Sequence, residues 1–543
     1  MTSAISVLAT LLNVKLMTIF NVKTEIEIRK KDGETYTQEQ WHVEVAPYKR
    51  VQKLCPVCGK KCPGYDTKRP SMAPRWRGPS MNGAPTFIYY NPSRIKCPEH
   101  GVLTEKLPWT DGNTRFLKDF NDEATYLSLS LPRSAVAEYL DIDWRTVGHC
   151  IKATHDRLEP DVSVRLHGVK RFCVDETSYK KGHKYITVVY DLDSGRVIWV
   201  HKDHGLEIFK LFCEALTPEE REQVEIVAGD GARWIDDCKK EYFPNAVRCI
   251  DPFHVITWVN KALDDTRIAS DAKTTKEFNA AKEAIFAEAK AERDSWLADY
   301  EKYKDALDQL AQLEHKRGRR SYEILRLMDF VKQFEADYGE TMEVLAQAKK
   351  AELTEEQKER LADLEAKVKN IKGCKYALGM NPENLSDYNT ERLELLKVSN
   401  PDLYSAYKLK EQIRVIIHMT DRKIAQKELD SWIEEVRNSN FPAFKKLAVK
   451  IEKHKENILN SIEFGESSSM SEQTNGTIKK LIQIACGFRN LDNMFALIYL
   501  RCSDLVIPLA NRYRPTKEGL KKKRKRANEL RRKRQEAKMA AHA

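Results

Sequence analysis

The stretch from residue 172 to about residue 261 constrains the fold most, because its apolar residues change from the two-residue period of strands to the longer period of helices in a fixed order. Strands are predicted at 172–174, 185–190, 197–201, 224–228 and 246–250, with helices near 206–216 and from Ala232. A turn at 193–195 joins the second and third strands as a hairpin. Three antiparallel strands followed by helix, strand, helix and strand is the order of an RNase H-like mixed sheet.

Two aspartates stand at the ends of these predicted strands. Asp175 follows the apolar strand that starts at Phe172, and Asp230 follows the strand at 224–228 with a glycine on each side. A single strand-end aspartate is usually a turn or cap residue. Two such acids on adjacent strands favour a shared divalent ion. Phosphodiester cleavage without a covalent intermediate needs two divalent ions held a few ångströms apart by carboxylates.

The third acid of such a site is expected on a helix packed against the sheet. Glu472 opens a predicted helix that runs through Ile484, and Glu472, Asn475 and Lys479 fall on one of its faces. This oxygen-rich set suits Mg²⁺, for which Mn²⁺ can substitute. The alternative for Glu472 is an acid in the first turn that interacts favourably with the helix dipole.

Asp251, just after the strand at 246–250, is the rival for the second acid. Asp230 has the better strand-end and glycine setting, so Asp251 is assigned to positioning or substrate contact. His254 follows in the same run and is equally consistent with a packing residue and a catalytic one. Asp251, His254, Asn475 and Lys479 are therefore expected at the periphery of the active site.

The same short motif occurs twice near the amino terminus, first from Cys55 to Cys58 and again from Cys97 to His100, each followed by glycine. The two-residue spacing lets both side chains of a tight turn face one ion, and four nitrogen and sulfur ligands suit structural Zn²⁺. Cys62 is a rival ligand, but it has no partner of matching spacing. The sequence predicts a zinc module that closes over a hairpin insertion.

The pattern of apolar and capping residues over 116–160 predicts short helices with a three-residue break at 141–143. This is the spacing of a helix-turn-helix. The second helix is expected to project Arg145, Thr146, His149 and Lys152 toward a major groove. In the zinc module, Arg75 and Arg77 flank Trp76, the basic and aromatic mixture that DNA contact requires. Many three-helix bundles share this pattern without binding DNA, so the DNA interpretation depends on the neighbouring zinc module and acids.

Residues 262–460 have an almost wholly helical and charged pattern. Apolar residues recur every three or four positions at Trp296, Tyr300, Tyr303, Leu307 and Leu310, and again at Leu361, Leu364, Val368 and Ile371. Such stripes indicate helix packing or a coiled-coil hairpin rather than a part in catalysis. The expected fold is thus multidomain α/β, with the mixed sheet interrupted by a long helical insertion.

The formal net charge of +11 is concentrated near the carboxyl end, where residues 517–538 hold twelve basic and three acidic residues. This tail either adds sequence-independent affinity for phosphates or is simply solvated. Twelve cysteines are too few for a disulfide scaffold, and Lys15 interrupts the first apolar stretch before a membrane-spanning length. We expect a soluble, reduced, cytoplasmic protein with no membrane association, located at the nucleoid when bound to DNA.

Over about residues 40–265 and 370–502, the chain resembles the zinc-finger DDE transposases of bacterial insertion sequences, the ISL-three group. The shared features begin with the two metal-binding motifs at 55–58 and 97–100, which we call the knuckles. The others are residues 174–176, 181–185, 191–197, 251–255 and 381–385, Glu472 with Asn475, Ile478 and Lys479, and residues 487–490. The resemblance implies that the amino-terminal part, with the zinc module and the helix-turn-helix, binds terminal inverted repeats. It also implies that Asp175, Asp230 and Glu472 cleave and transfer strands with Mg²⁺. The chain differs from the group in the glycine after Asp230 and in its long, charged segment 265–370.

Three functions fit these observations. The first is an active transposase that forms a homo-oligomer on double-stranded DNA, and retention of all three acids favours it. The second is a catalytically silent DNA-binding repressor or architectural protein of the same descent. The third, a plain nuclease, leaves the zinc module, the helix-turn-helix and the helical insertion without a function.

The predicted domains are a helix and strand pair (1–50), the zinc module (51–110), the helix-turn-helix (111–165), the first part of the core (166–264), the helical insertion (265–460), the last part of the core (461–512) and the basic tail (513–543).

Overall fold

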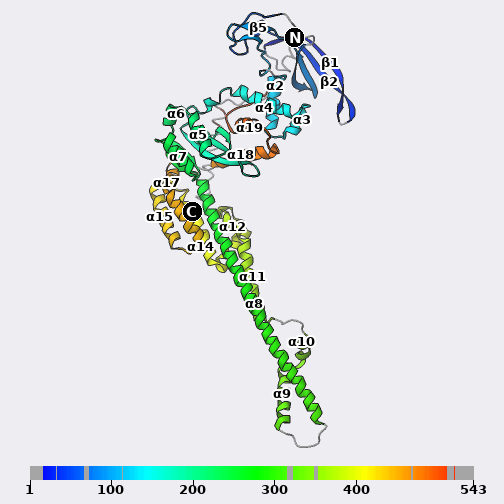
Figure 1. Cartoon of the computed structure of the whole chain (residues 1–543), viewed down its shortest axis with the longest axis vertical. Helices are drawn as coiled ribbons and strands as arrows, with labels where there is room; N and C mark the ends of the chain where they lie inside the picture. Colours follow the sequence, from blue (N-terminus) through cyan, green and yellow to red (C-terminus); the bar gives the residue numbers. More distant parts are fainter. Residues whose placement is uncertain are drawn as a thin grey trace. The chain divides into compact units, whose positions relative to one another are not determined.

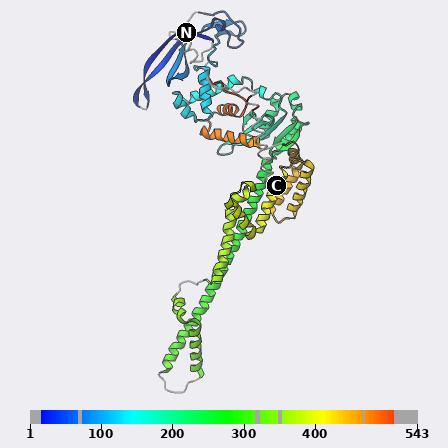
Figure 2. The same cartoon turned by 180° about the vertical axis from the view of Figure 1, so that it is seen from behind.

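The computed structural model describes residues 16–31, 33–66, 73–112, 114–314, 322–347, 353–465 and 469–509, together with positions 519 and 522. The chain divides into two compact units, seen from two sides in Figure 1 and Figure 2. The sheet unit comprises residues 1–254 and 456–543, and the helical unit comprises residues 255–455. Residues 1–15, where the helix of the first predicted domain was expected, and most of the basic tail lie outside the described residues.

The sheet unit begins with a four-stranded sheet of order β1-β2-β4-β3. Its strands are β1 (Met17–Lys31), β2 (Glu34–Pro47), β3 (Arg75–Met81) and β4 (Ala84–Tyr89). β4 pairs in parallel with β2, so the hairpin between the two knuckles extends the sheet of the amino-terminal strand pair. A separate two-stranded sheet of β5 (Arg94–Cys97) and β6 (Gly101–Thr104) carries the second knuckle.

Three helices follow and share an apolar core with the four-stranded sheet. They are α2 (Lys118–Ser128), α3 (Arg133–Leu140) and α4 (Trp144–Leu158). Phe120, Val136 and Ile151 pack in one cluster with Trp76 of β3 and Val43 of β2. The turn between α3 and α4 ends at Asp143, whose side chain accepts the backbone N–H of Arg145 at 2.7 Å and so caps α4.

A five-stranded mixed sheet forms the rest of the sheet unit. It contains β7 (Arg171–Lys180), β8 (Lys184–Asp191), β9 (Val197–Lys202), β10 (Ile226–Gly229) and β11 (Val247–Ile250) in the order β11-β10-β7-β8-β9. The first three strands are antiparallel, and β10 and β11 run parallel to β7. The connecting helices are α5 (Leu206–Ala215), α6 (Pro218–Glu222) and α7 (Arg233–Tyr242). The predicted mixed α/β sheet is confirmed.

Helices cover both faces of this sheet, as alternation along β7 requires. Phe172 packs with Phe209 of α5 and Ile235 of α7 on one face. Cys173 packs on the other face, with Ile478 of α18 (Ser469–Ile484) and residues of α19 (Leu491–Cys502). The helix α19 was not among the helices predicted from the sequence. The twelve residues of α19 are mostly buried, so this helix has no broad polar face to mark its period.

The helical unit contains most of α8 (Pro252–Glu314) and the helices that follow it. These are α9 (Tyr322–Tyr338), α10 (Met342–Gln347), α11 (Glu355–Gly373), α12 (Lys375–Gly379), α13 (Asp387–Ser399), α14 (Pro401–Ile416), α15 (Arg422–Asn438) and α16 (Pro442–Lys453). The aromatic stripe of α8 packs against α9, where Tyr303 meets Phe334, and both views show α9 beside the far half of α8. None of the described helices is long and apolar enough to cross a membrane.

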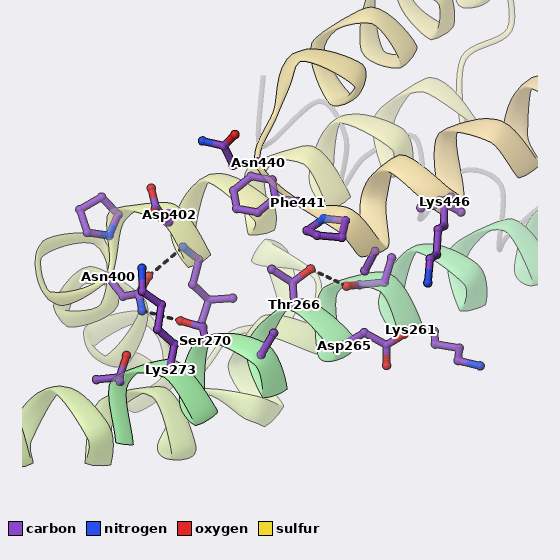
Figure 3. Close-up of a pocket in the computed structure, with 18 of the residues that line it drawn as sticks. Lys261, Asp265, Thr266, Ser270, Lys273, Asn400, Asp402, Asn440, Phe441 and Lys446 are labelled. Atoms are coloured by element: carbon purple, nitrogen blue, oxygen red, sulfur yellow. Dashed lines mark hydrogen bonds between the residues drawn. The ribbon is translucent and has the colours of Figure 1, made fainter. Parts of the chain in front are cut away.

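A cavity of about 1040 Å³ lies among α8, α14 and α16, and we call it the helical cavity (Figure 3). Its charged lining residues are Lys261, Lys273, Lys367, Lys446 and Lys450 together with Asp265, Glu277 and Asp402. The side-chain amide of Asn400 donates to Ser270 Oγ at 2.7 Å across this cavity. Acidic and basic groups are therefore mixed along its walls.

Candidate functional site

The parallel strands β10 and β11 end at Gly229 and Ile250, beside the middle of β7. The strand predicted at 172–174 continues as β7 to Lys180, paired with β8, so Asp175 lies within this strand and not at its end. The register pairs Gly229 of β10 with Val174 of β7 and with Ile250 of β11. The next residue along the chain in each case is an aspartate, namely Asp175, Asp230 and Asp251. Because neighbouring strands lie about 4.8 Å apart, these residues form a row, which we call the acid row. Asp230 occupies its middle position.

Hydrogen bonds hold the carboxylate of Asp175 on two sides. Its Oδ1 accepts the backbone N–H of Glu176 at 2.8 Å, and its Oδ2 accepts the side-chain N–H of Asn475 at 2.5 Å. The phenol of Tyr190 on β8 donates in turn to Asn475 Oδ1 at 2.5 Å. Burial of Tyr190, followed by the charge of Asp175, raises its pKa well above the ordinary value, so the phenol stays protonated and remains a donor. These bonds attach α18 to β7 and β8.

Close packing positions the loop that carries Asp230. A Cβ on Gly229 would lie 2.9 Å from the carbonyl oxygen of Val174 and 2.8 Å from Ile235 Cδ1, so β10 needs glycine at its end. The buried side chain of Arg248 donates to the backbone carbonyl of Asp230 and, at 2.9 Å, to Asp236 Oδ1. Asp230 Oδ1 itself accepts the N–H of Ala232 at 2.9 Å.

Asp251 and His254 occupy different positions beside this row. Asp251 is 5% exposed, and its Oδ1 accepts the N–H of Phe253 at 3.0 Å, the bond of an N-cap at the start of α8. His254 Nε2 lies 3.6 Å from Asp175 Oδ1. Burial lowers the pKa of His254, but the carboxylates of Asp175, Asp251 and Asp230 outweigh burial and leave that pKa raised.

Glu176 is an acid of this region that the sequence reasoning did not single out. Its Oε2 lies 3.4 Å from His204 Nδ1. Burial raises the pKa of Glu176, His204 opposes that shift, and the negative charges of Asp230 and Asp175 add to it. Glu176 therefore belongs to the electrostatic environment of the acid row. The Asp-Glu doublet at 175–176 was the available signal in the sequence.

The remaining predicted residues of this region lie on α18. Glu472 is in this helix, three residues before Asn475, and its side chain lies outside the described part of the structure. Lys479 is one turn beyond Asn475 and is exposed. Residues three or four apart are neighbours on one helix face, so positions 472, 475 and 479 share a face of α18.

The two knuckles bring four metal-binding side chains together. The ligand atoms of Cys55, Cys58, Cys97 and His100 all lie within 4.8 Å of one another. Cys58 Sγ is 3.8 Å from Cys97 Sγ, and His100 Nδ1 is 3.5 Å from Cys97 Sγ and 3.8 Å from Cys55 Sγ. Tetrahedral Zn²⁺, bonded at about 2.3 Å to sulfur and 2.0 Å to nitrogen, separates its ligands by roughly 3.5–3.8 Å. The four side chains therefore fit Zn²⁺.

Backbone geometry explains why both knuckles end in glycine. Gly59 has φ of 71° and Gly101 has φ of 73°, a left-handed conformation that glycine adopts without strain. Cys62 packs in the same small cluster, and its thiol donates to the carbonyl of Lys60 at 3.4 Å. Cys62 is not among the four residues whose ligand atoms converge.

The predicted recognition helix, α4, has one buried and one exposed face. Arg145, His149 and Lys152 are exposed and Thr146 is half-buried. Lys152 pairs with Asp156 on the next turn at 2.9 Å. The exposed face of α4 is thus available to a ligand at most of the positions that the sequence indicated.

The two arginines of β3 differ in their surroundings. Arg75 is exposed, with its guanidinium 4.5 Å from the centroid of the Phe87 ring. Arg77 is 6% exposed, lies 5.4 Å from the rings of both Phe87 and Phe120, and donates to the carbonyl of Leu140 at 3.3 Å. Burial lowers the pKa of Arg77 to about 10. The expectation that Arg77 contacts DNA is wrong, because α2 and α3 cover its side chain.

Comparison with known proteins places the chain in a family. It matches the sequence profile of the ISL3 family of DDE transposases, described as "Transposase", over residues 172–353 and 341–498. The transposases for insertion sequence element IS1557 from two strains of Mycobacterium tuberculosis are each 30% identical over 456 residues, which is 84% of this chain and 87% of the relative. The transposase for insertion sequence element IS1001 of Bordetella parapertussis is 21% identical over 452 residues, covering 82% of this chain and 87% of that protein. The chain therefore belongs to the ISL3 family of insertion-sequence transposases.

Proposed function

We propose that this transposase binds the terminal inverted repeats of an insertion sequence and catalyses metal-dependent strand cleavage and strand transfer. The observation that carries the proposal is the acid row, to which Asn475 attaches α18. Asp175, Asp230 and Glu472 are the proposed metal ligands. The order of antiparallel and parallel strands supports an RNase H-like core, interrupted in sequence by the helical unit.

The carboxylates of Asp175 and Asp230 fit Mg²⁺, because both are hard oxygen donors at adjoining positions of β7 and β10 and both are partly exposed. When bound, Mg²⁺ or Mn²⁺ supplies activation of the attacking oxygen and stabilisation of the leaving oxygen. The chain itself orients the donors. Asn475 and Tyr190 hold one oxygen of Asp175, and Arg248 holds the backbone of Asp230.

We assign recognition of the DNA ends to the zinc module at 51–110 and the helix-turn-helix at 111–165. The three-residue turn between α3 and α4 supports a helix-turn-helix, and the exposed face of α4 presents Arg145, His149 and Lys152. Thr146 lies at the edge of this face, and Arg75 adds a cation on β3. Arg77 is left out, because it is buried.

The test is strand cleavage and joining on duplexes that carry the element's ends, with Mg²⁺ or Mn²⁺. Asp175→Asn, Asp230→Asn and Glu472→Gln are expected to lower joining by at least about a thousandfold while the ends are still bound. Asp251→Asn is the matched control, because asparagine also caps helices and should keep most of the activity.

Each other outcome changes the assignment. Loss of joining only in Asp251→Asn would make Asp251 the second metal ligand in place of Asp230. A wild-type protein that binds the ends tightly but joins nothing would support the catalytically silent repressor instead. Cleavage without any preference for the ends would support a plain nuclease.

A further inference from the structure

A second cavity, of about 620 Å³, lies in the sheet unit and is lined by Arg133, Trp144, Tyr179, Lys180, Cys486, Gly487, Phe488 and Arg489. We call it the arginine pocket. Three of these residues are cations, three are aromatic, and none is a carboxylate. Basic and aromatic side chains gathered in this way are the composition expected of a nucleic-acid contact.

Three separate chain segments build the arginine pocket. Arg133 and Trp144 are the first residues of α3 and α4, and Tyr179 and Lys180 end β7. The remaining four residues form the loop between α18 and α19, where Cys486 and Gly487 have φ of 52° and 92°. The pocket thus exists only when the predicted helix-turn-helix, the five-stranded sheet and α18 are assembled.

The aromatic rings hold the guanidinium groups in place. Arg133 lies 5.8 Å from the centroid of the Trp144 ring and 5.6 Å from that of Phe488. Arg489 lies 5.9 Å from the Trp144 ring. Cation–π contacts of this kind fix a guanidinium without neutralising its charge. Both arginines therefore keep their hydrogen-bond donors for another partner.

The three cations that line the arginine pocket have no carboxylate partner in the part of the chain that the structure describes. Among the described residues, Arg133, Lys180 and Arg489 make no ion pair with a carboxylate within 4.0 Å. Lys184 pairs in register with Lys180 at the tip of the same hairpin and adds to the charge. Like charges held together repel one another, and a bound polyanion removes that repulsion.

The position of the arginine pocket relative to the acid row follows from β7 and α18. The two elements touch at Asp175 and Asn475, and the end of β7 and the loop that follows α18 meet in the pocket. Four to five strand residues separate Asp175 from Tyr179 and Lys180, which is about 15 Å at a strand's rise. Eleven residues separate Asn475 from Cys486, which is about 16 Å at a helix's rise. In duplex DNA about 15 Å corresponds to four or five base pairs.

We propose that the arginine pocket binds the phosphodiester backbone of the element's DNA about four or five base pairs from the bond on which the acid row acts. This inference rests on the proposed function. Arg489 and Arg133 supply planar donors that match phosphate oxygens, and Lys180 supplies a point charge. Because Trp144 begins α4, the same contact aligns the predicted recognition helix with the acid row.

The test uses the full-length protein and a duplex that carries the element's end. Arg489→Ala is the main variant, because Arg489 is exposed on a loop, and Lys180→Ala is the second. Arg233→Ala is the matched control, since Arg233 is an exposed arginine of the same unit outside the pocket. Binding is measured at several salt concentrations. Each pocket variant is expected to lower affinity about tenfold and to reduce the salt slope by about 0.9, with no change in the control.

Phosphate ethylation interference locates the contact on the DNA. Wild-type protein is expected to show interference four or five base pairs from the cleaved bond, and Arg489→Ala is expected to lose it. Pocket variants that fold and bind with unchanged affinity, salt slope and interference would overturn this inference, while wild-type end joining would leave the proposed function intact. A wild-type protein without affinity for the ends would overturn both.

Discussion

The arginine pocket and the helical cavity are both large, but they balance their charges differently. The helical cavity is lined by five lysines and three acids, among them the Lys261, Asp265, Lys273 and Asp402 labelled in Figure 3. Its Lys367 pairs with Asp363, just outside the lining, at 2.9 Å. The charged residues that line the arginine pocket are all cations. A set of mixed charges can compensate itself, whereas a set of one sign is stable in a fold chiefly when a partner of opposite charge binds.

The same distinction separates the other charged clusters of the transposase. The three cysteines of the knuckles are placed so that they could bind a metal as thiolates, and the acid row brings carboxylates together. A bound cation would compensate the negative charge of each of these two sets, as a bound anion would compensate the positive charge of the arginine pocket. The helical cavity needs neither, so we interpret its charges as structural.

Removal of zinc should have the largest effect among the tests that compare clusters needing a bound ion with the mixed charges of the helical cavity. Cys97→Ser, or a strong chelator, is expected to release one Zn²⁺ per chain and to unfold the knuckles, because metal binding in such modules supplies about 10 kcal/mol or more of folding free energy. Binding of the element's ends should then fall roughly a hundredfold. Metal analysis and equilibrium binding measure the two effects.

Cys62→Ser is the control for that experiment. Cys62 is in the same small core but outside the set of converging ligand atoms, so its substitution should leave the zinc content unchanged. If Cys62→Ser released the metal and Cys97→Ser did not, the ligand set would have to be reassigned.

Local patterns were sufficient to predict much of this molecule. The strands and helices from β7 to β11 follow from the alternation and periodicity of 172–250, and the knuckles follow from a spacing of two residues. Both signals lie within a few residues of one another in the chain. The periodicity shows which side chains of a segment face the core and which face water, and the two-residue spacing shows which side chains can face one ion.

Features that depend on distant segments could not be predicted. The parallel pairing of β2 with β4 and the bond from Asn475 to Asp175, 300 residues apart, have no local signature. The burial of Arg77 depends on α2 and α3. The helix α19 was missed because it is buried on most sides, so hydrophobic periodicity could not reveal it.

A smaller effect should come from the close contact that sets the spacing of the acid row. Gly229→Ala places a methyl group against the carbonyl of Val174 and the side chain of Ile235, which forces β10 away from β7. We expect a loss of about 1–3 kcal/mol in stability and a fall in joining beyond the loss of folded protein. Thermal unfolding and joining assays on the same preparation separate the two.

Gly476→Ala is the matched control, because no atom lies within 4 Å of a Cβ at this helical position on α18. Alanine there should stabilise the helix by about 0.5–1 kcal/mol and leave joining unchanged. A Gly229→Ala protein with unchanged stability and activity would show that the acid row tolerates displacement of its middle strand.

The smallest effect should come from the helical cavity, and it decides whether the comparison between the two cavities holds. Lys273→Ala removes an exposed lysine that lines this cavity opposite acidic groups. Since those groups already compensate much of the charge, affinity for the element's ends should change less than about threefold and the salt slope should stay constant. The same binding assay as for Arg489→Ala measures both quantities. A loss in Lys273→Ala as large as that in Arg489→Ala would mean that mixed charges do not mark a structural cavity in this protein, and that DNA contact extends into the helical unit.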